Sequence, residues 1–223
     1  MLRPGNDKGL ATPIPLGLAA LATTTFFLGI ATIFQPQISW PPYLMQAVLF
    51  GGLVELLAGM WAFAYGDALA ATAFSFLGAF FGWWGLVYAA LPVHTAAAAS
   101  INSVAAVFVV TGVVTFYLWI ASFYEFAAFN LVLLFLWIAF SLMGIATYTG
   151  VETLATIGGI SALISGVIGA YTSFAGIYNA TSLKEVIPLG EFNEVRQRAE
   201  RDEMERIQRI HAAERVDRAS LRA

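Results

Sequence analysis

The positive charges of this chain are confined to its two ends. Between Gly9 and Leu183 the sequence contains no lysine or arginine and only four acidic residues. Charged residues make up 11% of the chain, whereas soluble domains carry ~25%. A soluble protein would need charge spread over its surface, so the sequence predicts an all-α polytopic membrane protein. The four acids are Glu55, Asp67, Glu125 and Glu152, and the cations are Arg3, Lys8, Lys184 and the eight arginines from Arg196 to Arg222.

Six segments are long and apolar enough to cross a bilayer, which takes ~20 mostly apolar residues in a helix. Short stretches rich in proline, glycine and polar residues, such as QPQISWPP and YTGVE, separate them. Because these connections are short, we expect successive helices to be antiparallel neighbours. The predicted spans are 14–34, 43–65, 70–91, 96–120, 126–147 and 154–178.

An even number of spans places both ends of the chain on one side of the membrane. Cytoplasmic segments carry an excess of lysine and arginine, so we predict a multi-pass protein of the cell membrane with both termini cytoplasmic. The predicted parts are a cytoplasmic N-terminal segment (1–12), a transmembrane domain (13–183) and a charged cytoplasmic C-terminal segment (184–223). Opposite charges at i,i+4 spacing favour a soluble helix in the last segment, and a disordered tail is the alternative.

Small residues recur along one face of two predicted spans. Gly52 and Gly59 are seven residues apart in the second span, and small residues follow one another at steps of three and four in the sixth. Small side chains let helix backbones approach closely in lipid, where helices gain little from hydrophobic burial. We therefore predict that Gly52, Gly59, Gly158 and Gly169 lie at helix–helix contacts, within a protomer or between subunits.

One carboxylate lies inside a predicted span, in the stretch FGGLVELLAGMW (50–61). A charge at mid-depth costs ~2.5–3.5 kcal/mol on insertion scales. At helical spacing Glu55 shares a face with Gly52 and Gly59, so we expect it to point toward a neighbouring helix or an aqueous path. Burial disfavours the ionised form, and no span supplies a cation. We predict a protonated Glu55 that donates a hydrogen bond to a neighbouring helix, either for proton coupling or as a structural contact.

Three separated stretches resemble motifs of one transporter family. They are TPIPLGLAALATTT (12–25), FGGLVELLAGMWAFAYGDALAATAFSFLGAFF (50–81) and NATSLKEVIPLGE (179–191). They resemble, in the same order, the opening, the second and third spans, and the closing motif of the acetate uptake transporter family, which includes the succinate–acetate permeases.

The resemblance implies six-helix protomers that assemble as hexamers. Each protomer would have its own path for acetate, or for succinate in some members, with transport generally linked to protons. The family's path narrows on the first, third and fifth spans, at positions that align with Leu21, Leu77 and Leu131. Thr24 and Thr25 match a threonine pair just beyond the first constriction, where hydroxyls can hydrogen-bond a carboxylate.

The chain departs from the family pattern at two of the constriction positions and at Glu55. Leu21 and Leu77 replace a phenylalanine and a tyrosine of familiar members, which removes a ring and a hydroxyl from the expected constriction. Glu55 stands where relatives commonly have glutamine.

The predicted function is a membrane transporter or channel for acetate or a similar small monocarboxylate, linked to protons. One alternative is a pore for a small neutral solute or for ammonium or ammonia, which an all-leucine constriction favours. Another is a non-transporting membrane scaffold that acts through its charged tail. The sequence has no cysteine, phosphate loop, zinc motif or assignable catalytic set, so we expect no enzyme activity. The resemblance to the acetate uptake transporter family implies no ATP, metal or organic cofactor. The expected partners are a small carboxylate, the lipid bilayer and further copies of the chain, and not nucleic acid.

Overall fold

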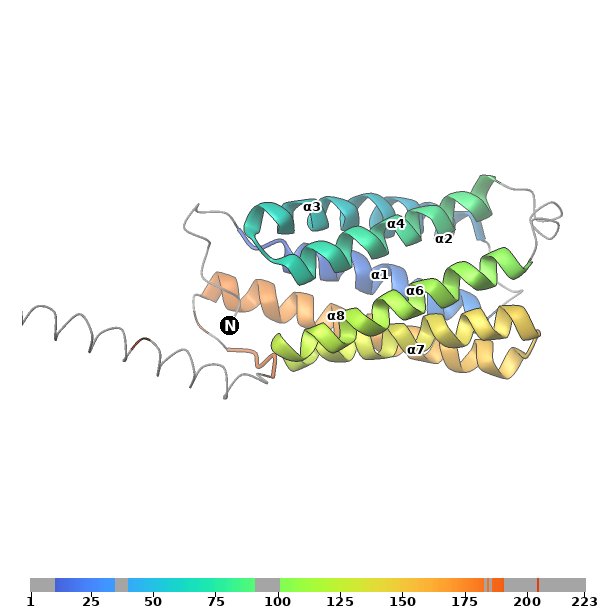
Figure 1. Cartoon of the computed structure of the whole chain (residues 1–223). Coiled ribbons are helices and arrows are strands. Elements are labelled where there is room, and N and C mark those ends of the chain that lie inside the picture. The colour runs from blue at the N-terminus through green and yellow to red at the C-terminus, as the bar shows by residue number, and fades with distance from the viewer. Residues whose placement is uncertain are drawn as a thin grey trace, which may run out of the picture.

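The computed structural model describes residues 11–34, 40–90, 101–182, 184, 186–190 and 204 (Figure 1). Six of its helices are long and apolar enough to cross a membrane, which confirms the predicted all-α, six-span fold. The second span combines three helical segments. The elements are α1 (Ile14–Ile33), α2 (Trp40–Gln46), the π-helix η1 (Ala47–Val54), α3 (Glu55–Tyr65), α4 (Ala68–Ala90), α6 (Ile101–Ala121), the 3₁₀ turn η2 (Ser122–Tyr124), α7 (Ala127–Thr149) and α8 (Glu152–Ser182).

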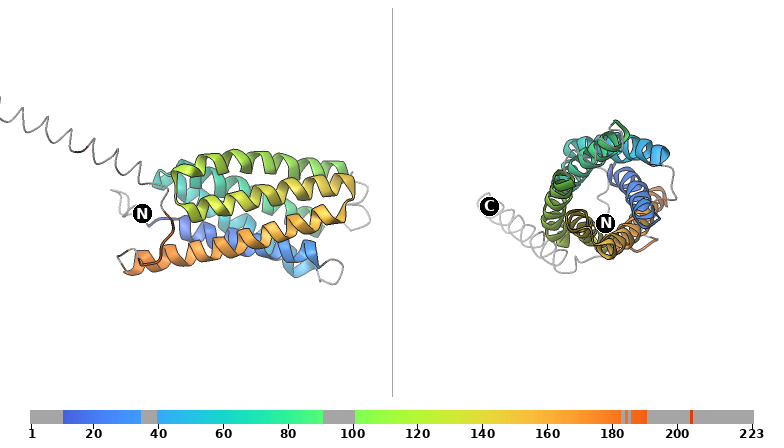
Figure 2. Two further views of the ribbon diagram at one scale, coloured as in Figure 1. Left: turned by 90° about the horizontal axis from the view of Figure 1, so that it is seen from below. Right: turned by 90° about the vertical axis from the view of Figure 1, so that its right-hand side faces the viewer.

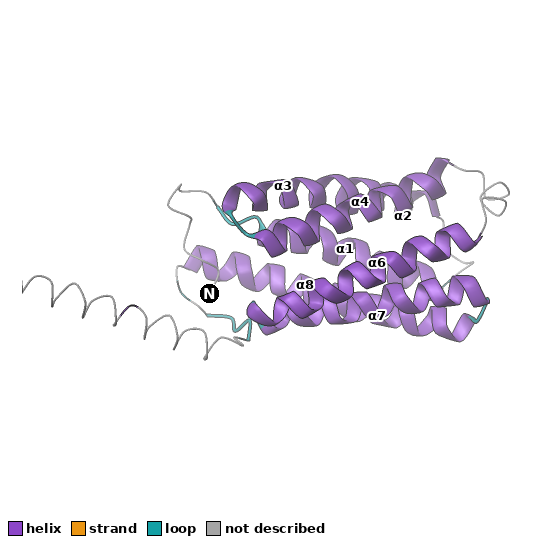
Figure 3. Cartoon of the chain, in the orientation of Figure 1, coloured by secondary structure: helices purple, strands orange, loops and turns teal. Residues whose placement is uncertain are grey.

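Two very tight connections keep successive helices together (Figure 3). Gly66 and Gly150 end α3 and α7 in the left-handed conformation, with φ of 88° and 72°, which glycine adopts without steric cost. Asp67 follows at once, and its carboxylate accepts a hydrogen bond of 2.9 Å from the backbone N–H of Ala70 in the first turn of α4. A short acidic side chain at this point satisfies a helix donor that would otherwise have no partner.

The six spans form a ring when the bundle is viewed along its length (Figure 2). Around the ring, α1 contacts α8, α8 contacts α7, and α7 contacts α6; α6 then contacts α4, which contacts the η1–α3 segment, and that segment contacts α1. The first residue of α1 and the last of α8 lie at the same end of the bundle (Figure 1), as an even number of spans requires. The C-terminal helix or tail predicted for 191–223 lies outside the described residues, apart from residue 204.

Glycines bring the second span close to the third. A Cβ added to Gly52 would lie 2.9 Å from the Cα of Gly82, and one added to Gly59 would lie 2.5 Å from the backbone nitrogen of Ser75. These distances are shorter than van der Waals contact, so the two backbones approach as closely as glycine allows.

Glycines of the last span bring it close to the neighbouring helices on both of its sides. An added Cβ on Gly158 would lie 3.2 Å from the carbonyl oxygen of Ala139 in α7, and one on Gly169 would lie 3.1 Å from the Cβ of Ala22 in α1. All four glycines singled out by their spacing thus lie at helix–helix contacts within one protomer.

A short segment after α8 folds back onto the end of the bundle. The side-chain oxygen of Asn179 accepts hydrogen bonds of 2.9 Å from the N–H groups of Val186 and Ile187, and its amide donates to the Ile187 carbonyl at 2.8 Å. The carbonyl of Leu189 accepts a 3.0 Å bond from the N–H of Ala128 in the first turn of α7. Residues 186–190 therefore pack against the transmembrane helices, beyond the boundary predicted at 183.

Candidate functional site

Four helices of the ring each carry a stripe of buried side chains that faces the interior of the ring. On each helix the residues recur at steps of three and four, which places them on one face. None of them is more than 5% exposed. The stripes are Leu18, Leu21, Thr25 and Leu28 on α1; Phe74, Leu77 and Phe81 on α4; Phe108, Thr111, Thr115 and Leu118 on α6; and Phe129, Leu133, Leu136 and Phe140 on α7.

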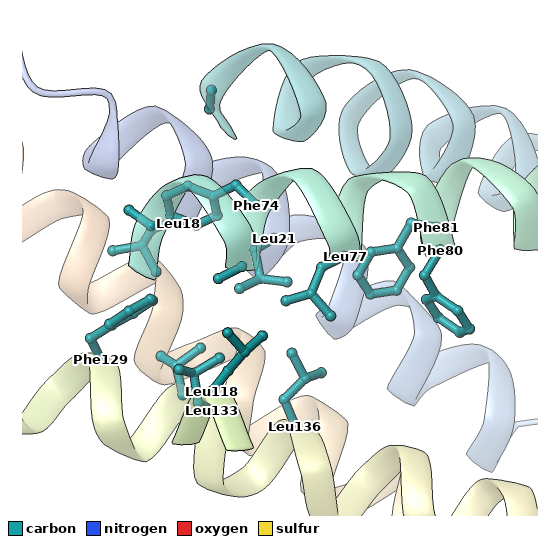
Figure 4. Packing of buried hydrophobic residues seen from close by; sticks show 14 of the residues in the cluster. Leu18, Leu21, Phe74, Leu77, Phe80, Phe81, Leu118, Phe129, Leu133 and Leu136 are labelled. Carbon is teal, nitrogen blue, oxygen red and sulfur yellow. The ribbon is translucent and has the colours of Figure 1, made fainter. Parts of the chain in front are cut away.

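The middle of the bundle is closed by leucines. Leu21 and Leu77 lie on one side, and Leu118, Leu133 and Leu136 lie across from them (Figure 4). We call these five side chains the leucine layer. All are fully buried or nearly so, and none carries a polar atom, so the layer is a barrier to any ion that remains hydrated.

Phenylalanines lie beyond the leucine layer on both sides (Figure 4). Toward the start of α1, the rings of Phe74 and Phe129 have centroids 6.3 Å apart. Toward the other end, the ring of Phe80 packs edge-on against that of Phe140, with the ring centroids 4.8 Å apart. This geometry is favourable for aromatic pairs. Within the described residues, leucine and phenylalanine side chains therefore close the middle of the interior.

Leu131, expected at the constriction, is placed elsewhere by the structure. It is 40% exposed on the outer face of α7, whereas Leu133 is fully buried. Two residues correspond to ~200° around an α-helix, so the two leucines point in nearly opposite directions. The fifth span contributes Leu133 and Leu136 to the layer, and Leu21 and Leu77 lie in the same buried cluster.

The hydroxyls of Thr24 and Thr25 are both bonded within the protein. Thr24 donates to the Ala20 carbonyl at 2.9 Å and accepts a 3.1 Å bond from the side-chain amide of Gln46. Thr25 donates to the Leu21 carbonyl at 2.9 Å. In this state neither hydroxyl has a free proton for a carboxylate. Only Thr25 continues the interior stripe of α1, because Thr24 lies against Gly51 of η1.

Glu55 is fully buried at the start of α3, near the middle of the second span. The expected hydrogen bond to a neighbouring helix is absent, because neither carboxyl oxygen has a partner among the described residues. Gln46 Oε1 and Ser75 Oγ are also buried without a partner. In the described ranges no cluster of three or more His, Cys, Asp and Glu side chains could hold a metal ion.

A small hollow lies at the end of the bundle where α1, α4 and α7 begin. Its volume is about 10 Å³, and two acids, Asp67 and Glu125, line it together with Ile14, Phe126 and Phe129. Phe129 also belongs to the interior stripe of α7, so the hollow adjoins the buried interior at this end, and we call it the mouth.

Comparison with known proteins places the chain in a family. The model of the GPR1/FUN34/yaaH family matches residues 1–193. The chain belongs to this family. The resemblance inferred from the three sequence motifs is therefore confirmed.

The chain is similar in sequence to several transport proteins. Acetate permease A of Emericella nidulans is 30% identical over 203 residues, which cover 83% of this chain and 67% of the permease. Ammonia transport outward protein 2 of Saccharomyces cerevisiae is 28% identical, and the chain spans 64% of its length. The succinate-acetate/proton symporter SatP of Escherichia coli K12 is 25% identical over 84% of this chain and 98% of the symporter.

A solved structure has the same fold. The bacterial acetate channel SatP superimposes with a TM-score of 0.73 at 21% sequence identity, covering 81% of this chain and 99% of the channel. The chain thus shares its fold with this solved channel.

The structure adds two polar interior residues to those expected from the family motifs. Thr111 and Thr115 of α6 are buried, and Thr115 donates a 2.7 Å hydrogen bond to the Thr111 carbonyl. They lie in the stripe that begins at Phe108 and ends at Leu118. That spacing is visible in the sequence, but every residue type on this span is also compatible with a lipid-facing helix, so the pattern alone does not single them out.

Proposed function

We propose that this protein is a membrane transporter or channel for acetate or a similar small monocarboxylate, and that transport is linked to protons. The observation that carries the proposal is a ring of six membrane-spanning helices similar in sequence to proteins named acetate permease and succinate-acetate/proton symporter. An apolar interior that also holds buried threonines suits a small solute that is mostly apolar with one polar end.

The leucine layer gives the path its selectivity. A methyl group can contact Leu21 and Leu77 without cost, whereas a carboxylate loses its hydration there. The hydroxyls of Thr25, Thr111 and Thr115 lie in the same interior stripes as the layer. Once the leucine side chains move apart, each hydroxyl can donate a hydrogen bond to a carboxylate or accept one from a protonated carboxylic acid.

Uptake of labelled acetate into proteoliposomes tests this function. We expect uptake above that of protein-free liposomes, and a severalfold increase when the outside is more acidic than the inside. Unlabelled propionate should compete, whereas a neutral solute of similar size such as glycerol should not. Uptake equal to that of empty liposomes under both conditions would overturn the proposal.

A second candidate is a pore for ammonium or ammonia, or for another small neutral solute. The two acids at the mouth, Asp67 and Glu125, favour a cation over a carboxylate there. A relative named ammonia transport outward protein 2 supports the same reading. An outward ammonium gradient across the same proteoliposomes should then change internal pH faster than in empty ones, with no acetate uptake.

The proposal includes the arrangement of the protein in the cell membrane. Both termini are cytoplasmic, because all eleven Lys and Arg residues lie outside the spans, and the protomers form a homo-oligomer, a hexamer by resemblance. Epitope tags at either end should be accessible to antibody only after the cell membrane is permeabilised. A tag that is stained on intact cells would contradict this topology.

A further inference from the structure

We propose that Glu55 is a proton-binding site, and that Gln46, Glu55 and Ser75 form a polar route by which a proton passes the leucine layer beside the substrate. The inference rests on the proposed function, since it concerns how a proton crosses in the same protomer. It goes beyond that function by assigning the proton its own residues, on the second and third spans.

Contacts of the neighbouring glycines fix the level of Glu55 in the bundle. A Cβ on Gly51, one turn before Glu55, would lie 2.7 Å from the Cβ of Phe81, and one on Gly59, one turn after it, would lie 2.4 Å from Ser75 Oγ. Because α3 and α4 run antiparallel, Glu55 lies opposite the residues between Ser75 and Phe81. Leu77 is one of these, so the carboxyl lies at the level of the leucine layer.

Three polar side chains on these spans have a buried atom without a partner among the described residues. They are Gln46 at Oε1, Glu55 at both carboxyl oxygens and Ser75 at Oγ. Buried polar groups are nearly always hydrogen-bonded, so three such groups near one helix pair need an explanation. Gln46 precedes Glu55 in the second span, and Ser75 lies beside Gly59, one turn after Glu55, so the three side chains follow one another along the span.

Among the described residues, no charged side chain lies on a helix packed against Glu55. The elements packed against η1 and α3 are α1, α2 and α4. None of these helices contains Asp, Glu, Lys, Arg or His, and their titratable groups are only Tyr43 on α2 and Tyr88 near the end of α4. On η1 and α3 themselves the other titratable group is Tyr65, at the end of the span. A proton is therefore the counter-charge for Glu55 inside the membrane.

The helix next to Glu55 has an unusual geometry. Residues 47–54 form a π-helix, and the N–H of Glu55 bonds to the carbonyl oxygens of both Gly52 and Phe50. π-helical turns inside α-helices occur frequently at functional sites. The two glycines leave only backbone beside Glu55, and this backbone is packed against Thr24, Phe81 and Gly82, so water reaches the carboxyl only when these helices move apart.

The proposed step is simple in its balance. The Glu55 carboxylate takes a proton from water on one side and becomes the neutral acid, and it then releases that proton to water on the other side and becomes the carboxylate again. Gln46 and Ser75 carry the hydrogen bonds of the water that delivers and removes it. The substrate anion crosses through the leucine layer, so the two charges cancel without sharing one path.

Three variants of the full-length protein in proteoliposomes test the inference. Glu55→Gln keeps the size of the side chain and removes the proton, Ser75→Ala removes one hydroxyl, and Glu152→Gln is the matched control, an exposed acid at the start of α8. Labelled acetate uptake is measured with and without an inward proton gradient, and proton entry is followed with an internal pH dye. Infrared difference spectra between acid and neutral pH detect the carbonyl band of a protonated carboxyl.

We expect Glu55→Gln to retain acetate uptake without a gradient but to lose the stimulation by the gradient, the proton entry and one infrared carbonyl band. Ser75→Ala should reduce the proton entry severalfold and keep the band, and Glu152→Gln should behave as the wild type. Stimulation that survives in Glu55→Gln, or an unchanged infrared spectrum, would overturn the inference. A wild type with proton entry and the band but no acetate uptake would instead overturn the proposed function and keep the proton site.

Discussion

Gly59→Leu is expected to abolish the folded protein. A Cβ alone at this position would lie 2.4 Å from Ser75 Oγ and 2.5 Å from the backbone nitrogen of Ser75. The backbone nitrogen cannot move without α4, so the second and third spans must separate. Overpacking a well-packed core costs ~1–3 kcal/mol even when side chains can shift, and here the obstacle is backbone. Size-exclusion chromatography in detergent should show aggregate or no protein.

Ala64→Leu is the matched control, because it adds a similar side chain to the exposed face of the same helix. It should elute as the wild type. Gly59→Ala should be intermediate, with a lower melting temperature. Adding Ser75→Gly to Gly59→Ala should restore only part of the loss, since the backbone nitrogen stays in place. A monodisperse Gly59→Leu protein with wild-type stability would contradict the close approach of these helices.

Leu21→Ala and Leu77→Ala are each expected to raise substrate flux about tenfold, which corresponds to ~1.4 kcal/mol off the barrier. Both side chains are fully buried in the leucine layer, so truncation shortens the apolar stretch that the carboxylate must cross. Larger monocarboxylates such as butyrate should gain more than acetate does. The measurement is initial uptake in proteoliposomes, normalised to the amount of folded protein.

Leu131→Ala makes the same chemical change on the outer face of α7, where Leu131 is 40% exposed, and should leave flux unchanged. Leu→Ala in a core can cost ~2–5 kcal/mol, so Leu77→Val serves as a milder variant if the alanine proteins do not fold. Flux that rises in Leu131→Ala but not in the Leu21 and Leu77 variants would show that the family alignment, and not the packing in this structure, locates the constriction.

The sequence alone does not predict which face of α7 carries Leu131. The stretch LVLLFLW (131–137) is apolar on every side of the helix. In a soluble protein the polar face would reveal the buried one, but in a membrane the lipid-facing and interior faces are both apolar. Choosing Leu131 over Leu133 therefore depended on the alignment of a motif, and a shift of two residues reverses the face.

The contacts of Glu55 and Asn179 also depend on distant segments. The sequence predicts the burial of Glu55, because glycines at helical spacing mark a packed face, but it does not predict the π-helix or the missing partner. Both follow from how Gly51 and Gly52 fit against Thr24, Phe81 and Gly82. Likewise, Asn179 bonds the 186–190 segment only because α8 ends beside the start of α7.

The sequence by itself determined the number of spans and the family. It also determined that both ends of the chain lie on one side of the bundle, and which faces of the second and sixth spans carry glycines. These depend on composition and on spacing along one helix, which are local properties. Only the tertiary structure decided which leucines close the interior, that Thr24 is bonded to Gln46, and that Glu55 has no partner. Those depend on the rotation and register of one helix against another, and in a bundle with apolar residues on all its faces the balance between packing contacts, not polarity, sets them.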